Sequence, residues 1–519
     1  MNNEKKITTK KSPKDEQIKD MLVDEKTMPA NNKESQASLM ISLAMDRAYF
    51  FHTHDGEPYA CYIVEERLET AQIKDKSFQS WLNYIYYKET GKPISPSSLQ
   101  NASRIFQAEA EYKGTEEQVY IRYANHGGNI YIDLANKRWE QIEITKGQGW
   151  KIIAASESPV KFRRVKGMAP LSIPSKKASF TPLKTFFHFE EEDYILTIAW
   201  LIGSMNPKGP FPVMALSGEQ GTAKSTTSRI LKDIIDPSTT PLISLPRNER
   251  DLAIAADGTW SLLFDNISKL SGNMSDALCR ISTGGGFRTR ALYSNNDEIF
   301  FNSTRPIIIN GISDFIIRQD LADRSIIINL PFIPENRRMP ERKLWSIWEN
   351  VKPLVLGALC NTLSTTLLNI DNQNNNSSYS RMADFECFVE AAESVLPWKK
   401  SSFRKAYREN KSKIIDITFD SDDVAGAVLK MIEQTHSHEF TGSPTELLKT
   451  LDTHIDDKTQ KLKEWPKKPN ILSNRLKRCA PFLRAKGILL ERGKSGQRYI
   501  KIYKTDDIVQ SIHKSRSKK

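Results

Sequence analysis

One short segment of this chain combines the residue types that hold a phosphate. Residues 218–225 read Gly-Glu-Gln-Gly-Thr-Ala-Lys-Ser. Gly218 and Gly221 allow the backbone to curl so that its N–H groups converge on one anion, and Lys224 follows at the spacing that reaches β- and γ-phosphates. Ser225 adds a hydroxyl for Mg²⁺. The segment therefore predicts a phosphate-binding loop, with ATP and Mg²⁺ as cofactors, although Ala223 stands where the usual pattern has a third glycine.

The flanking residues provide the context that such a loop needs. An apolar run at 211–216 predicts a buried strand, and 226–235 predicts a helix whose N-terminus favours an anion. The residues expected to contact the triphosphate are Gly218, Glu219, Gln220, Gly221, Thr222, Ala223, Lys224, Ser225 and Thr226.

A second apolar run, 260–265, ends in Asp265, which we expect to hold Mg²⁺ with Ser225. A base that polarises the attacking water commonly follows such an acid, but here the next residue is Asn266, which cannot accept a proton. Glu249 follows another apolar run and is an alternative base. The competing interpretation, a solvated surface glutamate, is favoured by its charged neighbours.

Two further polar residues sit at the ends of predicted strands. Asn310 ends the run 304–309 and is expected to orient water near the γ-phosphate; the alternative is a turn residue before Gly311. Arg324 precedes the strand 326–330 and is a candidate arginine finger for a neighbouring subunit. Its alternative is an ion pair with Asp320 or Asp323, which contributes little when exposed.

Residues 283–293 contain three consecutive glycines followed by Arg288 and Arg290. This composition predicts a β-hairpin. The two arginines would contact DNA phosphates from such a hairpin, or pair with groups of their own domain, and the sequence does not decide between these.

The 519 residues allow about three domains. We expect a disordered arm over 1–37 and a mixed α+β domain over 38–170. An α/β motor with a helical lid is expected over 171–415, because strands and helices alternate there as in a covered parallel sheet. A C-terminal domain over 416–510 and a basic tail over 511–519 complete the chain.

No apolar run approaches the roughly 20 residues of a membrane span, and the first residues lack a signal peptide's apolar core. Five scattered cysteines favour a reducing compartment. We therefore expect a cytoplasmic protein without a membrane partner.

Charge is concentrated at the C-terminus. Residues 441–519 hold 20 basic and 8 acidic side chains, which accounts for the whole net charge of +12. A capping box at 443–446 begins one helix, 470–485 predicts a second, and short strands flank a basic turn at 493–496, the layout of a winged helix. The residues expected to contact DNA here are Arg475, Lys477, Arg478 and Lys494. A winged helix can also bind protein, and the positive charge favours DNA.

The phosphate loop, Asp265, Asn310 and Arg324, in that order, resemble an AAA+ ATPase. The Gly-Thr-Ala-Lys-Ser form is similar to the MCM replicative helicases, and with the C-terminal layout the chain resembles MCM-like helicases of bacterial mobile elements and prophages, including staphylococcal chromosome cassettes. Zinc ligands of the MCM type are missing from the N-terminal half.

This resemblance implies a hexameric ring around single-stranded or forked DNA, with ATP between subunits, and loader or primase partners. It implies that Lys224, Ser225, Asp265 and Asn310 act in one subunit, Arg324 acts on its neighbour, and Arg381 is a second nucleotide-sensing arginine. The expected function is an ATP-dependent DNA helicase for mobile-element replication. The alternative is a nucleotide-gated replication initiator with little hydrolysis, which Asn266 favours. An AAA+ protein that remodels protein partners fits the basic C-terminus less well.

Overall fold

The computed structural model describes residues 35–285, 287–290, 298–301, 304–312, 318–372, 379–420, 422–462, 465–495 and 497–505. The expected tail and almost all of the expected arm lie outside these ranges. The chain divides into two compact units, one of residues 1–63 and 71–117 and the other of residues 64–70 and 118–519. The division therefore falls inside the N-terminal domain expected over 38–170.

Residues 35–117 place helices beside a three-stranded sheet of order β1-β2-β3, and residues 67–70 of β3 are counted with the second unit. The elements of residues 35–117 are α2 (Gln36–Met45), β1 (Ala48–His52), β2 (Pro58–Val64), β3 (Arg67–Gln72), α3 (Lys76–Thr90) and α4 (Pro96–Tyr112). Ser95 caps α4 and Pro96 occupies its first turn, a common helix start. Phe50 and Phe106 stack in the core with ring centroids 4.9 Å apart.

The second unit begins with a four-stranded antiparallel sheet of order β5-β6-β7-β8. Its strands are β5 (Tyr123–His126), β6 (Asn129–Asp133), β7 (Glu140–Thr145) and β8 (Gly149–Ala154), and β4 (Val119–Tyr120) pairs in parallel with β9 (Lys161–Phe162). The turn between β5 and β6 lies at Gly127 and Gly128, which both have positive φ as a tight hairpin turn requires.

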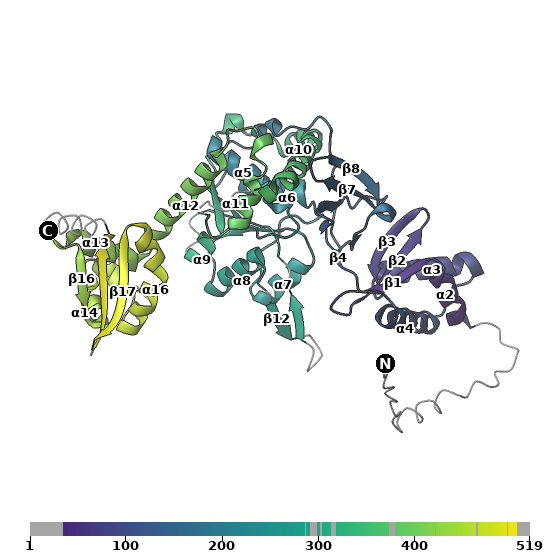
Figure 1. Ribbon diagram of the computed structural model, residues 1–519, viewed down its shortest axis with the longest axis horizontal. Helices are drawn as coiled ribbons and strands as arrows, with labels where there is room; N and C mark the ends of the chain where they lie inside the picture. The colour runs from purple at the N-terminus through teal and green to yellow at the C-terminus, as the bar shows by residue number, and fades with distance from the viewer. Residues whose placement is uncertain are drawn as a thin grey trace, which may run out of the picture. The chain divides into compact units, whose positions relative to one another are not determined.

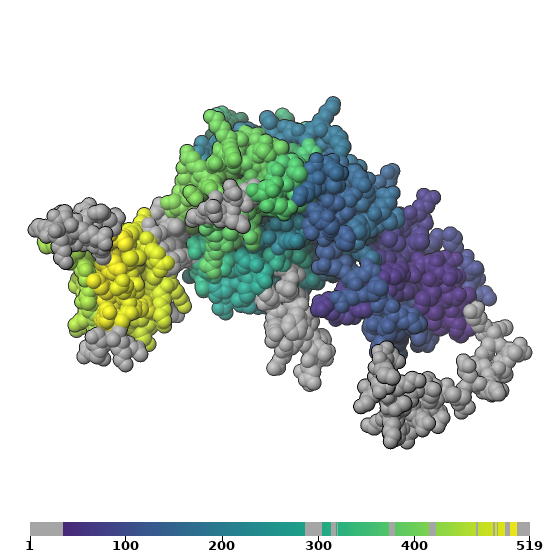
Figure 2. Space-filling view, viewed as in Figure 1, coloured from purple at the N-terminus to yellow at the C-terminus, as the bar shows by residue number. Residues whose placement is uncertain are grey.

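These strands share one hydrophobic core with the parallel sheet that follows. Ile130, Ile142 and Trp150 belong to the same cluster as Trp200 and Leu359, and Figure 2 shows the blue segment passing into teal and green without a break. This common core explains why no boundary appears at residue 170.

The central parallel sheet has the order β11-β14-β10-β15, with β10 (Val213–Ser217), β11 (Leu262–Ile267), β14 (Ile307–Gly311) and β15 (Ser325–Asn329). Ile243 pairs with Phe264 of β11 through an isolated parallel bridge, which extends the sheet by one residue beside β11. The strands are rich in Ile, Leu and Val, as expected for a sheet covered on both faces.

Alternate residues of these strands face two different helical layers. Met214 and Ile308 pack with α5 (Glu191–Ser204), α6 (Lys224–Ile235) and α10 (Glu341–Asn369). Ala215 and Ile309 pack with α7 (Glu249–Asp257), α8 (Gly272–Thr283) and α9 (Gln319–Ala322). Figure 1 shows α5, α6 and α10 together above, and α7, α8 and α9 together below.

By length and composition alone, the helical stretch Glu341–Asn372 is a candidate membrane span. However, 56% of its apolar window is buried against the rest of the fold, as in the core helix of a globular domain. The remaining short helical turns are η1 (Ala155–Glu157), η2 (Thr181–Thr185), η3 (Glu335–Arg337), η4 (Ile370–Asn372) and η5 (Glu393–Val395).

Two helices, α11 (Ala383–Glu390) and α12 (Ser402–Asp420), follow α10, and the boundary expected at residue 416 falls inside α12. The C-terminal region then folds around its own core, which includes Val428, Leu447 and Leu476. Its elements are α13 (Asp423–Gln434), β16 (Glu439–Gly442), α14 (Pro444–Asp452), α15 (Asp457–Lys461), α16 (Pro469–Ala485), β17 (Ile488–Ser495) and β18 (Gln497–Lys504), with an antiparallel sheet of order β16-β18-β17.

Candidate nucleotide site

The segment 218–223 connects the end of β10 to the first residue of α6, as the sequence predicts. A Cβ atom at Gly218 would lie 2.8 Å from Thr222 Oγ1 and 2.9 Å from the Leu330 carbonyl oxygen, so only glycine fits without displacing neighbours. Gly221 has φ of 88°, a conformation that side chains disfavour. The two glycines therefore shape the curve of the loop.

Ala223 occupies the N-cap of α6 in the left-handed conformation, with φ of 60°. This is the conformation for which glycine is usually chosen, and it costs an L-residue roughly 1–2 kcal/mol. Ala223 adopts this conformation, so α6 still begins directly after the loop although alanine replaces the usual glycine.

The Lys224 ammonium group lies within the curve of the loop. Its Nζ donates to the carbonyl oxygens of Gly218 at 2.8 Å and Glu219 at 2.6 Å. Burial lowers the pKa of Lys224, and the charge of Asp265 opposes this effect. A phosphate placed against the loop would offer this ammonium group stronger, charged acceptors.

Ser225, Asp265 and Asn310 meet at the carboxyl end of the sheet. Ser225 Oγ donates to Asp265 Oδ1 at 2.7 Å, and Asn310 Nδ2 donates to the same oxygen at 2.8 Å. The strand order explains the meeting, because β14 lies between β10 and β11. Three residues predicted from separate strand ends are thus brought together.

Ser228 also belongs to this cluster, and the sequence prediction missed it. Its Oγ accepts from Asn310 Nδ2 at 2.9 Å, and Asn310 is 1% exposed. Ser228 lies three residues after Ser225 on α6 and therefore on the same helix face. That spacing was the available signal.

Asn266 differs from its neighbours in backbone conformation. Its φ is 57°, and the pairing of β11 with β14 shifts register between Phe264 and Ile267. Its backbone N–H donates to Asn310 Oδ1 at 2.9 Å. Asparagine tolerates this left-handed conformation better than most residues, and the bulge leaves its side chain exposed.

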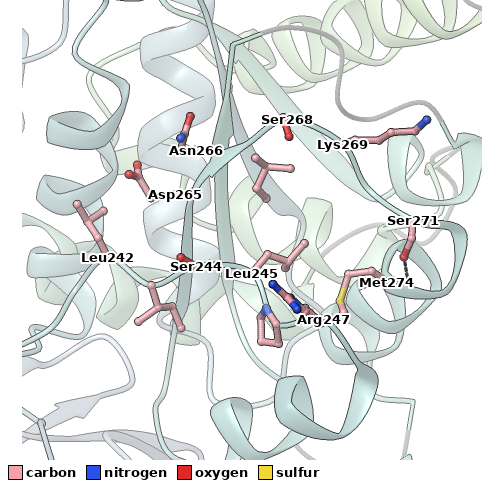
Figure 3. A pocket seen from close by; sticks show the side chains of 13 residues that line it. Leu242, Ser244, Leu245, Arg247, Asp265, Asn266, Ser268, Lys269, Ser271 and Met274 are labelled. Atoms are coloured by element: carbon pink, nitrogen blue, oxygen red, sulfur yellow. Dashed lines mark hydrogen bonds between the residues drawn. The ribbon is translucent and has the colours of Figure 1, made fainter.

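A pocket of about 620 Å³ lies beside Asp265 and Asn266. Figure 3 shows these two residues at one end of the pocket, with Arg247 and Met274 toward the other. Asp265 is the only carboxylate among its described lining residues, and Glu249 does not line it.

Glu249 begins α7 and is engaged elsewhere. Its Oε2 accepts from Arg280 Nη2 on α8 at 2.6 Å. Glu249 is therefore partly exposed, as expected for a surface glutamate, and it also forms an ion pair with Arg280.

The two predicted nucleotide-sensing arginines converge on one aspartate. Arg324 Nη1 donates to Asp320 Oδ1 and to the Asp320 carbonyl oxygen at 2.8 and 2.9 Å, and Arg381 Nη1 donates to Oδ1 at 2.8 Å. Burial opposes ionisation of Asp320, but the Arg324 hydrogen bond and both arginine charges hold its pKa below the usual value. The ion pair with Asp320, expected as the alternative to an arginine finger, is thus present. The Arg324 side chain is only 12% exposed, however, so the pair is not a surface pair. Its Nε has no hydrogen-bond partner among the described residues.

Helix α12 holds the backbone on both sides of Arg324. Lys411 Nζ donates to the carbonyl oxygens of Asp323 at 2.7 Å and Ser325 at 2.8 Å. Asn410 donates to the Ile327 carbonyl at 2.6 Å and accepts from its N–H at 3.2 Å, as a neighbouring strand would. Both residues lie more than 80 positions from their partners, and no local pattern predicts them.

The predicted hairpin around Arg288 and Arg290 has two antiparallel strands, β12 (Phe287–Arg290) and β13 (Glu298–Phe301). Arg288 pairs in register with Phe300, and Arg290 with Glu298. The two arginines are two positions apart and so share a face of the strand. Their side chains lie outside the described part of the chain.

The predicted DNA-contacting residues of α16 differ in their surroundings. Lys477 and Arg478 are exposed, whereas Arg475 is half-buried with Nη2 3.6 Å from Asp422 Oδ2. Arg475 is therefore partly neutralised within the domain. Lys494 lies on β17, and its side chain is outside the described residues.

The described residues contain no cluster of His, Cys, Asp or Glu that would hold a metal by itself. The Ser225 hydroxyl and Asp265 carboxylate fit Mg²⁺ as hard oxygen donors, provided that phosphate oxygens complete the coordination.

Two family models match this chain in succession. Residues 182–410 match the actinomycete integrative conjugative element replication protein, and residues 424–515 match the C-terminal domain of that RepA protein. The chain resembles a mobile-element replication protein. The matches cover the parallel sheet with its helices and the C-terminal region, which agrees with the mobile-element replication that the sequence predicts.

No curated protein matches this chain in sequence. Among solved structures, the A form apo structure of the NrS-1 C-terminal region is similar at a TM-score of 0.39 and 11% identity, covering 90% of this chain and 98% of that one. A second apo structure of that region gives a TM-score of 0.37 at 11% identity, covering 91% and 99%.

Proposed function

We propose that this protein is an ATP-driven DNA helicase that unwinds DNA during replication of a mobile genetic element. The observation that carries the proposal is the hydrogen-bonded set of Ser225, Asp265 and Asn310 beside a glycine-shaped loop with Lys224 inside it. These are the groups that bind a triphosphate with Mg²⁺ and orient water toward it.

In this proposal each residue has a distinct task. The loop N–H groups and Lys224 hold the β- and γ-phosphates, and Lys224 exchanges its loop carbonyl acceptors for phosphate oxygens. Ser225 and Asp265 hold Mg²⁺, which neutralises charge on the transferred phosphate when bound. Asn310 fixes the Asp265 carboxylate and orients the attacking water.

The proposed assembly is an AAA+ hexamer with ATP between subunits. It is supported by the convergence of Arg324 and Arg381 on Asp320 rather than on the loop of their own subunit. In this arrangement Arg324 leaves Asp320 to meet the γ-phosphate of a neighbour, where such a residue stabilises transition-state charge.

DNA contacts are assigned to two separate parts of the chain. The β12–β13 hairpin carries Arg288 and Arg290, and the C-terminal region, which we propose is a winged helix, presents Lys477 and Arg478 on α16. Exposed cations on a helix packed beside a β-hairpin suit backbone contacts with DNA.

A second candidate is a nucleotide-gated replication initiator that binds DNA and hydrolyses ATP slowly. Asn266 favours it, because Asp265 is the only carboxylate that the described residues contribute to the adjacent pocket, and Glu249 is bound to Arg280. Origin-specific DNA binding without DNA-stimulated hydrolysis would select this function.

Strand displacement from a forked DNA tests the helicase directly. We expect displacement with Mg²⁺ and ATP by the native protein and none by Lys224→Ala. Displacement that persists in Lys224→Ala would contradict the proposal.

A further inference from the structure

The connection between β15 and α10, residues 330–340, lies against the phosphate loop. The Leu330 N–H donates to the Ser217 carbonyl at 2.8 Å. A Cβ atom at Gly221 would lie 3.0 Å from Arg338 Nη2 and 3.7 Å from Phe332 Cε2. Residues 330–340 therefore pack against one side of the loop that we propose holds the triphosphate.

Phe332 is unusually placed for a large apolar side chain. It is 56% exposed, although it lies beside a loop made of polar groups. The Arg338 guanidinium lies over its ring, 5.5 Å from the centroid, and Arg338 Nε donates to the Ile333 carbonyl at 3.1 Å. The cation and its backbone bond hold the ring beside Gly221 while leaving more than half of Phe332 accessible.

We propose that Phe332 is the base-stacking residue of the nucleotide site, and that the ligand is therefore a nucleoside triphosphate and not a bare polyphosphate. The inference rests on the proposed function, because it requires the loop to hold the phosphates. When the phosphates lie along the loop, the base must leave it at an edge, and the exposed aromatic ring stands at the Gly221 edge. Stacking on an aromatic ring accepts any base, so Phe332 supplies affinity and leaves base identity to other groups.

Arg338 acts as a positioning residue in this inference. It covers the Phe332 ring and is tied to Ile333, so the ring direction is fixed before a ligand arrives. A ring held in advance loses little rotational freedom on binding, which makes each stacking contact more favourable.

The test compares ATP with inorganic tripolyphosphate, which carries the same phosphates without a base. Dissociation constants of both would be measured by calorimetry with Mg²⁺ on the full chain. We expect Phe332→Ala to weaken ATP binding roughly 5- to 150-fold, the equivalent of one lost base–aromatic stack, and to leave tripolyphosphate binding unchanged. Phe332→Trp should keep the preference for ATP.

Tyr112→Ala is a matched control, because Tyr112 is an exposed aromatic residue, 85% accessible, in the other unit of the chain. It should leave both constants unchanged. An unchanged ratio of the two constants in Phe332→Ala overturns the inference, and a change of oligomeric state with that ratio intact assigns the ring to a subunit contact instead. If the native protein binds neither compound, the proposed function fails and the inference fails with it.

Discussion

Asn310 Nδ2 donates to Asp265 Oδ1 across 2.8 Å, from a side chain that is almost completely buried. The same amide group contacts Ser228 through Nδ2 and the Asn266 backbone through Oδ1. Because one rigid carboxamide makes all three bonds, the direction of the Asp265 carboxylate is set by the protein before the proposed Mg²⁺ or nucleotide binds.

Asn310→Ala should therefore lower ATP turnover by about 10- to 100-fold, the usual effect of losing a group that orients a metal ligand. The Mg²⁺ concentration for half-maximal rate should rise, because Asp265 is no longer held in place. Ser228→Ala removes only one of the three bonds and should have a smaller effect. Equal rates of ATP hydrolysis in the native protein and in Asn310→Ala would show that Asn310 has no role in hydrolysis.

Arg324→Ala should reduce hydrolysis by about 10³-fold or more while ATP binding persists, if this arginine acts on a neighbouring subunit. Mixing Arg324→Ala with Lys224→Ala should restore part of the activity, because some interfaces then combine an intact loop with an intact arginine. A purely structural role predicts a lower melting temperature and no recovery on mixing. The rate of ATP hydrolysis at several mixing ratios checks this.

Lys411 should make stability depend on pH. Burial lowers its pKa from 10.5 to about 7, although the charges of Asp323 and Glu386 oppose the shift. Between these pH values the unfolded chain binds a proton that the folded chain has released, so the free energy of unfolding should rise with pH from about 7 upward. The slope from this group is at most about 1.4 kcal/mol per pH unit.

Lys411→Met keeps the length of the side chain but not its titration. Denaturant unfolding at pH values from neutral to mildly alkaline should show a smaller rise in stability for Lys411→Met than for the native protein. Identical slopes in the two proteins would contradict the assigned pKa shift.

On α16, Lys477→Ala and Arg478→Ala should each weaken DNA binding and lower the slope of log affinity against log salt by about one unit. Arg475→Ala should change that slope less, because its guanidinium already faces Asp422 at 3.6 Å. Titrations over a range of salt concentrations would measure all three. Slopes equal to that of the native protein in all three variants would show that α16 does not contact DNA.

Local patterns predicted those residues of the candidate site that end or directly follow an apolar run. The phosphate loop, Asp265 and Asn310 each end an apolar run, and a parallel sheet necessarily gathers such ends at one edge. By contrast, Asn410 and Lys411 reach a strand more than 80 residues away through backbone groups, which carry no sequence signal.

Two expected domain boundaries differ from the structure, each for its own reason. The N-terminal domain was expected to end at residue 170, but Ile142 and Trp150 share a core with Trp200, and burial between distant segments is not visible in local composition. The expected boundary at residue 416 lies in α12, because acidic residues at 416–423 do not by themselves end a helix.

The ATP-driven helicase is tested most directly by the rate of ATP hydrolysis with and without single-stranded and forked DNA, measured beside Lys224→Ala. A DNA helicase should show hydrolysis that DNA stimulates strongly and that Lys224→Ala abolishes. Tight ATP binding with negligible turnover in the presence of DNA would contradict a helicase and would indicate that Asn266 makes the protein a nucleotide-gated initiator.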